Sequence, residues 1–360
     1  MSSDIIQIIS VCIHIIINIY KDFYIYFLTT MDKGLTGLAN LGNTCFMNTC
    51  LQLLSHTPEI YHALKDKNID NKSLLHEFVE LRKMMWSENC TINPGRWVHC
   101  VQKTAAKNDM VIFTGFSQND LPEFLVFIIN NFHDTISRKV TMNINGTAED
   151  GTDDMAIRCY TMMKNMYQKD YSELLKLFFG IHVSQIVNPK TKKVMSNSPE
   201  PFFVVELPIP SGNKNPTLYD CFAHYSHPER LDGDNAWYNE KTKKKEDVDK
   251  QMVFWSLPNV MVIALKRFTN INRKINLYVD APHDNLDLSP YVKGYNKETY
   301  KYELFGVANH IGNAMGGHYF AHIKGESGKW YEFNDTIVKP IKENDVVSQK
   351  GYVFFYRKKE

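Results

Sequence analysis

Residues 37–54, GLANLGNTCFMNTCLQLL, carry a cysteine from a tight turn into an apolar run that predicts a helix. The Gly-Asn-Thr sequence before this cysteine consists of residue types that favour turns and helix N-caps. Cys45 would then lie at the positive end of the helix dipole, which favours the reactive thiolate. Cys50, one turn later and followed by leucines, fits a buried structural role better. Taken alone, the stretch supports a nucleophile at Cys45 and a small buried side chain there about equally.

A cysteine nucleophile needs a base that later protonates the leaving group, and this base is usually a histidine. Among 13 histidines, His318 differs from the others because Gly316 and Gly317 precede it in GNAMGGHYFAHIK (312–324) and a predicted strand follows it. Glycine pairs in such a place let a ligand or another backbone segment come close. The alternative interpretation is a glycine-rich hairpin turn with an incidental histidine.

The histidine in turn needs an amide or carboxylate that orients its ring. Asn334 and Asp335 occur in GKWYEFNDTIV (328–338), a predicted strand that follows the strand of His318. Side chains alternate between the faces of a strand, so only one of the two can point at the imidazole.

The composition is that of a globular protein, with 360 residues of which 44% are hydrophobic and 22% charged. A formal net charge of +1 provides no overall field that would recruit nucleic acid or an anionic membrane surface. Seven cysteines without a C-x-x-C pair argue against a disulfide framework and for a reducing compartment, so we expect a cytoplasmic location. The run KTKKKEDVDK (241–250) mixes charges of both signs, which predicts a solvated loop rather than a nucleic-acid-binding patch.

Residues 1–30 form a hydrophobic segment whose composition differs from that of the rest of the chain. Residues 5–20 are mostly apolar and FYIYFL follows at 23–28, but the run is interrupted by polar residues and falls short of the about 20 apolar residues of a membrane span. It also lacks the basic region and cleavage site of a secretory signal. Three interpretations remain open: a weak membrane anchor that uses residues 5–28, a helix docked on the domain, or a translated leader upstream of a start at Met31.

The order of the predicted elements indicates an α+β fold. Over about 37–133, apolar residues recur at helical spacing, most clearly in 74–85 and 121–132. Residues 140–160 are polar and contain glycine, which predicts a loop. After residue 177 follow short predicted strands that are rich in aromatic and β-branched residues. Helices first and strands afterwards are typical of an α+β arrangement.

Five stretches resemble motifs of the ubiquitin-specific proteases and occur in that family's order. The first and last are similar to the family's cysteine and histidine boxes, and the other three to a helix, a segment and a central strand between them: GLANLGNTCFMNTCLQ (37–52), FTGFSQNDLPEFLVFIINNFH (113–133), DGDNAWYNEKTKKK (232–245), LPNVMVIALKRF (257–268) and YELFGVANHIGNAMGGHYFAHIKGESGKWYEFNDTIVKPI (302–341). The resemblance covers residues 35–357 and implies one catalytic domain there. It implies a papain-like α+β fold with a helical thumb and a β-sheet palm and fingers.

The resemblance also implies roles for individual residues at the reaction centre. Cys45 matches the family's nucleophile and His318 its general base. Asn334 matches the third catalytic position, which is aspartate in many members and asparagine in some, and Asp335 beside it is placed to assist. Asn40 matches the asparagine whose side-chain amide helps to hold the oxyanion. Such a donor is worth about 2.7–4 kcal/mol in comparable sites.

Further residues are implied to bind the substrate. Asp120 and Glu123 resemble family acids that grip the basic C-terminal tail of ubiquitin, although acidic residues in the first turn of a helix also stabilise that helix. Gly316, Gly317 and Tyr319 would line the narrow cleft through which a tail ending in Gly-Gly reaches the nucleophile.

The activity implied by the resemblance is that of a thiol-dependent deubiquitinase. The Cys45 thiolate would attack the carbonyl of ubiquitin's terminal glycine, His318 would protonate the leaving amine, and water activated by the same imidazole would hydrolyse the thioester. The implied partners are ubiquitin and ubiquitinated proteins, with no nucleic acid. Two alternatives are a catalytically weak ubiquitin-binding scaffold and a protease for a ubiquitin-like modifier.

Many members of the family hold a structural zinc in the fingers with two C-x-x-C pairs, and this sequence departs from that pattern. The first pair would fall in HVSQIVNPKTKK (182–193), which has no cysteine, and Asn239 and Thr242 occupy the places of the second. Structural zinc sites take four Cys or His ligands, and His182 alone cannot replace them. We therefore predict no metal site and no cofactor.

Overall fold

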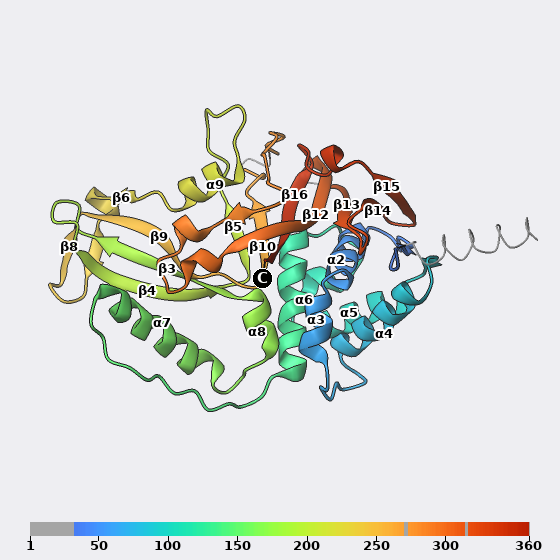
Figure 1. Ribbon diagram of the computed structural model, residues 1–360, viewed down its shortest axis with the longest axis horizontal. Coiled ribbons are helices and arrows are strands. Elements are labelled where there is room, and N and C mark those ends of the chain that lie inside the picture. The colour runs from blue at the N-terminus through green and yellow to red at the C-terminus, as the bar shows by residue number, and fades with distance from the viewer. Residues whose placement is uncertain (1–31, 270–272, 314–315, 360) are drawn as a thin grey trace, which may run out of the picture.

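The computed structural model describes residues 32–269, 273–313 and 316–359. The hydrophobic segment 1–30, with its three interpretations, lies outside the described residues. No helix of the described ranges is both long and apolar enough to cross a membrane. The described residues form a helical thumb, a palm sheet and a finger sheet that extends away from the thumb (Figure 1), so the predicted α+β fold is confirmed.

The thumb is built from helices of the first third of the chain. Its helices are α2 (Cys45–Ser55), α3 (Pro58–Leu64), α4 (Leu74–Ser87), α5 (Gly95–Lys107) and α6 (Leu121–Ile136). Helix α2 is buried along its whole length, between α6 on one side and palm strands on the other. A short parallel pair, β1 (Gly37–Leu38) with β2 (Thr91–Ile92), ties the segment before α2 to the thumb.

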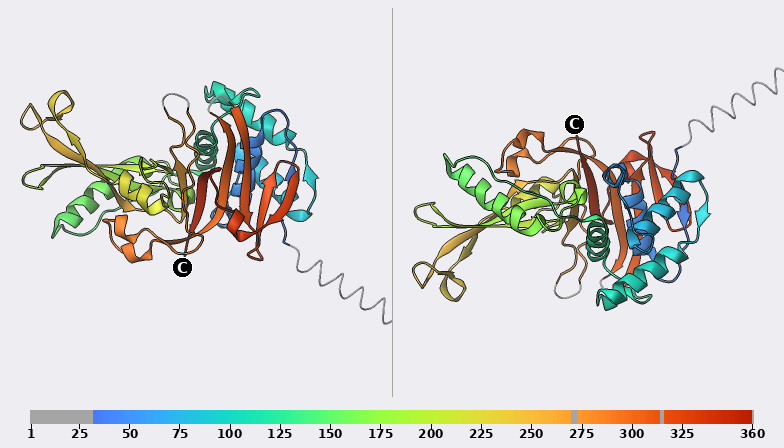
Figure 2. Two further views of the ribbon diagram at one scale, coloured as in Figure 1. Left: turned by 90° about the horizontal axis from the view of Figure 1, so that it is seen from above. Right: turned by 90° about the horizontal axis from the view of Figure 1, so that it is seen from below.

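The palm is a mainly antiparallel sheet from the last part of the chain, and it lies against α2 (Figure 2). Its strands run in the order β15 (Ile337–Ile341), β14 (Trp330–Asn334), β13 (Gly316–Lys324), β12 (Lys301–Asn313), β16 (Gly351–Lys358), β10 (Val260–Leu265) and β5 (Val204–Leu207), with β11 (Leu286–Asp287) also beside β12. All six residues of β10 are buried, as expected for a continuous apolar strand in the sheet interior. Helices α8 (Glu173–Phe178) and α9 (Leu218–Tyr225) pack on β10 and β5.

The fingers are a second antiparallel sheet with a separate hairpin. Its order is β4 (Val194–Phe202), β3 (Gly180–Val187), β9 (Val248–Ser256) and β6 (Glu229–Leu231), and the hairpin pairs β7 (Trp237–Asn239) with β8 (Lys244–Glu246). Residues 241–250, predicted to be a solvated loop, supply β8 and the start of β9, so that prediction is wrong. Pairing with strands β6 and β7 satisfies the backbone of this charged run while its side chains stay largely in solvent.

The loop predicted for residues 140–160 is confirmed for residues 140–149, which have no regular secondary structure, and wrong from Gly151 on, where helix α7 (Gly151–Tyr167) begins. Asp150 caps this helix, and its side chain accepts two backbone hydrogen bonds from the first turn. A short apolar face of α7 then packs on the finger sheet through Met155, Ala156 and Cys159. The polar first turn concealed this face in the sequence.

The two residues at the second C-x-x-C position make polar contacts with one carboxylate. Glu246 Oε1 accepts hydrogen bonds from Asn239 Nδ2 at 2.9 Å and from Thr242 Oγ1 at 2.5 Å, which ties the turn between β7 and β8. Amides and hydroxyls are not the ligands that structural zinc selects.

We expect elemental analysis of the purified protein to find no stoichiometric zinc. Within the described ranges, no group of three or more His, Cys, Asp or Glu side chains is arranged to hold a metal ion. One zinc per chain that survives dialysis against a mild chelator would contradict this prediction.

His56 makes the stability of the thumb depend on pH. Its ring lies between Trp86 and Phe333, and Nδ1 donates to the Gln52 carbonyl at 2.8 Å. Burial disfavours the imidazolium and lowers the pKa of His56 from 6.5 to about 4. The unfolded chain therefore takes up this proton first, and stability is lost as the pH falls from 6.5 toward 4.

Urea unfolding should accordingly show that a His56→Gln variant loses less stability than the parent between pH 7.5 and 5.5. The difference attributable to this one group is about 1.4 kcal/mol at the lower pH. Equal losses in the two proteins would show that His56 does not carry the effect.

Candidate active site

Cys45 is the first residue of α2, and a strained turn brings the chain to it. Gly42 and Asn43 both have left-handed backbone, with φ of 103° and 53°, which glycine and asparagine tolerate best. Thr44 is the N-cap residue, but its hydroxyl accepts from the Leu41 backbone N–H at 2.9 Å and does not cap the helix. Only 3% of Cys45 is exposed.

The structure brings Cys45, His318 and Asn334 together. His318 Nε2–H donates to Asn334 Oδ1 at 2.7 Å, which leaves Nδ1 for the sulfur. The hydrogen bond with Cys45 is the largest cause that raises the pKa of His318 to about 9; partial burial lowers it, and the bond to Asn334 raises it. The imidazole therefore keeps its proton at neutral pH beside the sulfur, as required for a thiolate–imidazolium pair.

The Asp335 carboxylate hydrogen-bonds to the loop that leads to Cys45. Its Oδ2 accepts from Asn40 Nδ2 at 3.0 Å and its Oδ1 from Asn48 Nδ2 at 2.8 Å. Its backbone carbonyl accepts from the Leu38 N–H at 2.8 Å. Asn334, the last residue of β14, thus orients the base. Asp335 lies in the turn after this strand, with a left-handed backbone (φ 50°), and its carboxylate positions the nucleophile loop.

Asn40 has an amide that is fixed at both ends. Its Oδ1 accepts from the backbone N–H groups of Gly42 and Thr44, each at 3.1 Å, and its Nδ2 uses one hydrogen for Asp335. The second Nδ2 hydrogen is available to a substrate oxygen, and a donor whose orientation is fixed in advance is what oxyanion stabilisation needs.

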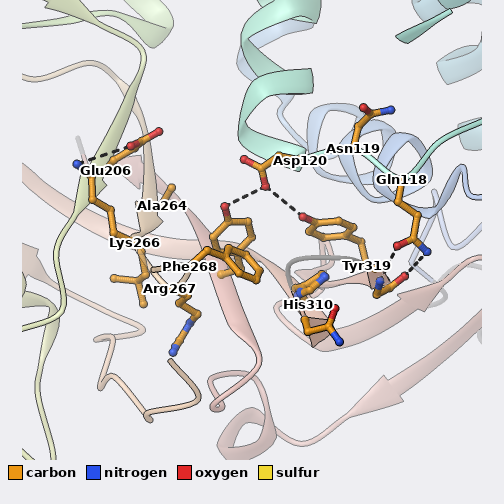
Figure 3. Close-up of a pocket in the computed structure, with 15 residues that line it drawn as sticks. Gln118, Asn119, Asp120, Glu206, Ala264, Lys266, Arg267, Phe268, His310 and Tyr319 are labelled. Carbon is orange, nitrogen blue, oxygen red and sulfur yellow. Dashed lines mark hydrogen bonds and ion pairs between the residues drawn. The ribbon is translucent and has the colours of Figure 1, made fainter. Parts of the chain in front are cut away.

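A cavity of about 490 Å³ lies next to the segment of β13 that carries His318, although Cys45, His318 and Asn334 are not among its lining residues (Figure 3). Gly316, Gly317 and Tyr319 of β13 line it, opposite Asp120 at the start of α6. Asp120 Oδ1 accepts from the hydroxyls of Tyr352 at 2.9 Å and Tyr319 at 3.2 Å. Burial raises the pKa of Asp120, and the two tyrosine bonds oppose this shift.

Residues 36–356 match the family described as ubiquitin carboxyl-terminal hydrolase. The chain belongs to this family. It is 32% identical over 342 residues to ubiquitin carboxyl-terminal hydrolase Usp2 of Drosophila melanogaster, covering 91% of this chain and 35% of that protein. It is 30% identical over 342 residues to ubiquitin carboxyl-terminal hydrolase 2 of Bos taurus, covering 90% of this chain and 55% of that protein. The chain thus spans about a third to a half of the length of these two relatives.

Solved structures of the same fold include the SAGA DUB module of Ubp8, Sgf11, Sus1 and Sgf73. The form bound to monoubiquitin matches with a TM-score of 0.70 and 25% identity, covering 95% of this chain and 74% of that one. The form bound to ubiquitin aldehyde matches with a TM-score of 0.68 and 25% identity, covering 92% and 72%. These matches confirm the predicted fold of a ubiquitin carboxyl-terminal hydrolase of the ubiquitin-specific protease type.

The acidic residues of this ubiquitin carboxyl-terminal hydrolase follow the cavity outward toward the fingers. Glu123, one turn into α6, is exposed and lines an adjoining cavity of about 760 Å³, which Asp120 also lines. Glu206 of β5 lines both cavities and lies 3.9 Å from Lys266 in an exposed ion pair. Three carboxylates therefore border the route from the fingers to the catalytic groups.

Sequence reasoning missed three residues that lie at this candidate site. Asn48 faces Asp335 from inside α2, and its only signal was a polar side chain in an apolar helix. Glu206 interrupts the apolar strand VVELPI. Gln118 precedes Asp120 in the motif 113–133, and nothing in its spacing indicated a contact with the histidine strand.

Proposed function

We propose that this chain is a thiol-dependent deubiquitinase that hydrolyses the peptide or isopeptide bond after the C-terminal glycine of ubiquitin. The observation that carries the proposal is the arrangement of Cys45, His318 and Asn334, in which a hydrogen bond to the sulfur raises the pKa of the imidazole to about 9. Family membership and the ubiquitin bound in two of the matching structures support ubiquitin as the substrate.

In the proposed reaction, the Cys45 thiolate adds to the glycine carbonyl and the carbonyl oxygen becomes an oxyanion that the free Asn40 N–H can hold. The carbon–nitrogen bond breaks as His318 transfers its proton to the leaving amine, and a thioester to Cys45 remains. His318 then takes a proton from water, whose oxygen attacks the thioester. The carbon–sulfur bond breaks, ubiquitin leaves with a free carboxylate, and the thiolate–imidazolium pair is restored.

We further propose that the carboxylates beside the cleft, Asp120, Glu123 and Glu206, attract the basic tail of ubiquitin. The cavity of about 760 Å³ between α6 and the fingers would admit this tail. Charges arranged in this way raise the rate of encounter and fix the register of the tail more than they add affinity.

A reducing compartment suits this chemistry, and we propose the cytoplasm. All six cysteines of the described ranges are free, and the most exposed of them, Cys90, would be at risk in an oxidising compartment.

The test is steady-state hydrolysis of a fluorophore amide joined to the C-terminus of ubiquitin, beside the same fluorophore on ubiquitin-like modifiers. The proposal expects hydrolysis of the ubiquitin conjugate that disappears in Cys45→Ala. Tight ubiquitin binding without hydrolysis would favour the scaffold alternative. Faster hydrolysis of another modifier would make the chain a protease for that modifier.

A further inference from the structure

The histidine strand β13 has an edge that no strand of the palm covers near His318. On one side, β13 pairs with β12 from Gly316 to Ile323. On the other, pairing with β14 starts only at Ala321. The backbone just before His318 therefore faces the cavity with groups that must find partners elsewhere.

Gln118 supplies those partners. The Gly317 N–H donates to Gln118 Oε1 at 2.6 Å, and Gln118 Nε2 donates to the Gly317 carbonyl at 2.8 Å (Figure 3). One side-chain amide thus makes the pair of hydrogen bonds that a residue of an antiparallel neighbour strand would make.

The same amide reaches toward the nucleophile loop. Gln118 Nε2 lies 3.5 Å from Asn43 Oδ1, and Asn43 Nδ2 donates to the Phe116 carbonyl at 2.9 Å. Asn43 stands two residues before Cys45, and Gly317 stands one residue before His318. The side chain therefore bridges the two segments that lead to Cys45 and His318, and it also lines the cavity.

The cavity walls beside Gln118 leave no room for side chains. A Cβ atom added at Gly316 would come within 2.8 Å of Gln118 Oε1. One added at Gly317 would overlap the His310 ring and the Ile311 carbonyl. Gly316 must therefore be glycine while Gln118 stays in place, whereas Gly317 must be glycine because of the β12 residues beside it, independently of Gln118.

We propose that Gln118 is a specificity-determining residue, whose amide closes the cleft over the last two residues of the substrate tail so that only glycines fit beneath it. This inference rests on the proposed function and adds the residue that sets its tail specificity. An enzyme discriminates between two substrates by the ratio of their kcat/KM values. A methyl group that has no room lowers kcat/KM for the bulkier tail and so increases the preference for glycine.

The experiment compares two fluorophore conjugates of ubiquitin, one with the natural Gly-Gly end and one whose last glycine but one is replaced with alanine. The parent should prefer the Gly-Gly tail strongly. In Gln118→Ala the ratio of the two kcat/KM values should shrink about tenfold, mainly through a gain on the alanine tail. Gln118→Asn, whose amide is one methylene too short to reach Gly317, should behave in the same way.

Two variants serve as controls. Gln118→Glu keeps the length and the accepting oxygen but cannot donate to the Gly317 carbonyl, so its ratio should lie between those of the parent and Gln118→Ala. Gln102→Ala removes an exposed amide that contacts the same thumb loop, at the Gly115 carbonyl, without touching β13. Its ratio should equal the parent's. Thermal unfolding establishes that each variant is folded.

A folded Gln118→Ala with an unchanged ratio would overturn the inference. An equal loss of kcat/KM for both conjugates would also overturn the inference, since it would show that Gln118 has a structural role only. If the parent hydrolyses neither conjugate, the proposed function itself fails and the inference falls with it, a result easily told apart from hydrolysis of the Gly-Gly tail with an unchanged ratio.

Discussion

Replacing His318 with alanine is expected to lower kcat for ubiquitin conjugates by about 10²- to 10⁴-fold, which is what a positioned general acid and base contributes. The imidazole is the partner of the Cys45 sulfur, and no second histidine of the described ranges contacts that sulfur. His310, the nearest candidate on β12, is buried among aromatic rings, and burial lowers its pKa to about 4. Its ring is therefore neutral at neutral pH and cannot serve as the general acid.

The pH dependence of kcat/KM provides a more specific test of the role of His318. Because the pKa of His318 is raised from 6.5 to about 9, the imidazolium persists up to that pH, and kcat/KM should fall as the pH rises through about 9. Asn334→Ala removes one bond that raises the pKa, so it should move this alkaline limb to lower pH and reduce kcat about tenfold. Asn334→Asp keeps an accepting oxygen at the same place, so its kcat/KM should still fall only at alkaline pH. If kcat/KM of the unsubstituted protein already fell at a pH below 7.5, the proposed ion pair would be contradicted.

Asp335→Ala is expected to reduce kcat by about 10- to 100-fold, which corresponds to the loss of charge-assisted hydrogen bonds. Two amides depend on this carboxylate: Asn40, the proposed oxyanion donor, and Asn48 inside α2. Asn48 is 3% exposed, so its amide would lose a buried partner and the protein should also unfold at lower urea concentration.

Kinetics separate the two roles of this residue. An Asn40→Ala variant should reproduce the loss in kcat, whereas Asn48→Ala should reproduce mainly the loss in stability. Asp335→Asn can accept only one of the two bonds and should be intermediate. If Asp335→Ala raised only KM, the carboxylate would be a substrate contact and not a support of the nucleophile loop.

Much of this architecture could be predicted because its signals are local. The turn before Cys45 needs glycine and asparagine in left-handed conformations, and the apolar run after it has helical spacing. Strands such as β10 are continuous apolar runs. The order of helices and strands therefore indicated the fold class before any coordinates.

The secondary-structure predictions failed where tertiary contacts outweigh the preferences of the local sequence. The start of α7 reads as a polar loop, and only the finger sheet gives its few apolar residues something to pack against. The charged run 241–250 forms strands because neighbouring strands take up its hydrogen bonds. Local propensity cannot register such partners.

The candidate site could likewise be predicted only in part. The alternation expected along a strand implied that only one of Asn334 and Asp335 faces the histidine, but it did not say which. In the structure β14 ends at Asn334, and Asp335 lies in the following turn, where it holds Asn40. The contact of Gln118 with Gly317 joins residues that are 199 positions apart in the chain. Neither local spacing nor periodicity carries information about such a contact.

The most direct test is reaction with ubiquitin whose C-terminus carries an electrophile, followed by peptide mapping of the adduct by mass spectrometry. The proposed geometry predicts a single adduct on Cys45, much slower labelling in His318→Ala and none in Cys45→Ala. Labelling that persists in Cys45→Ala, or an adduct on the exposed Cys90 in place of Cys45, would contradict the assignment of the nucleophile.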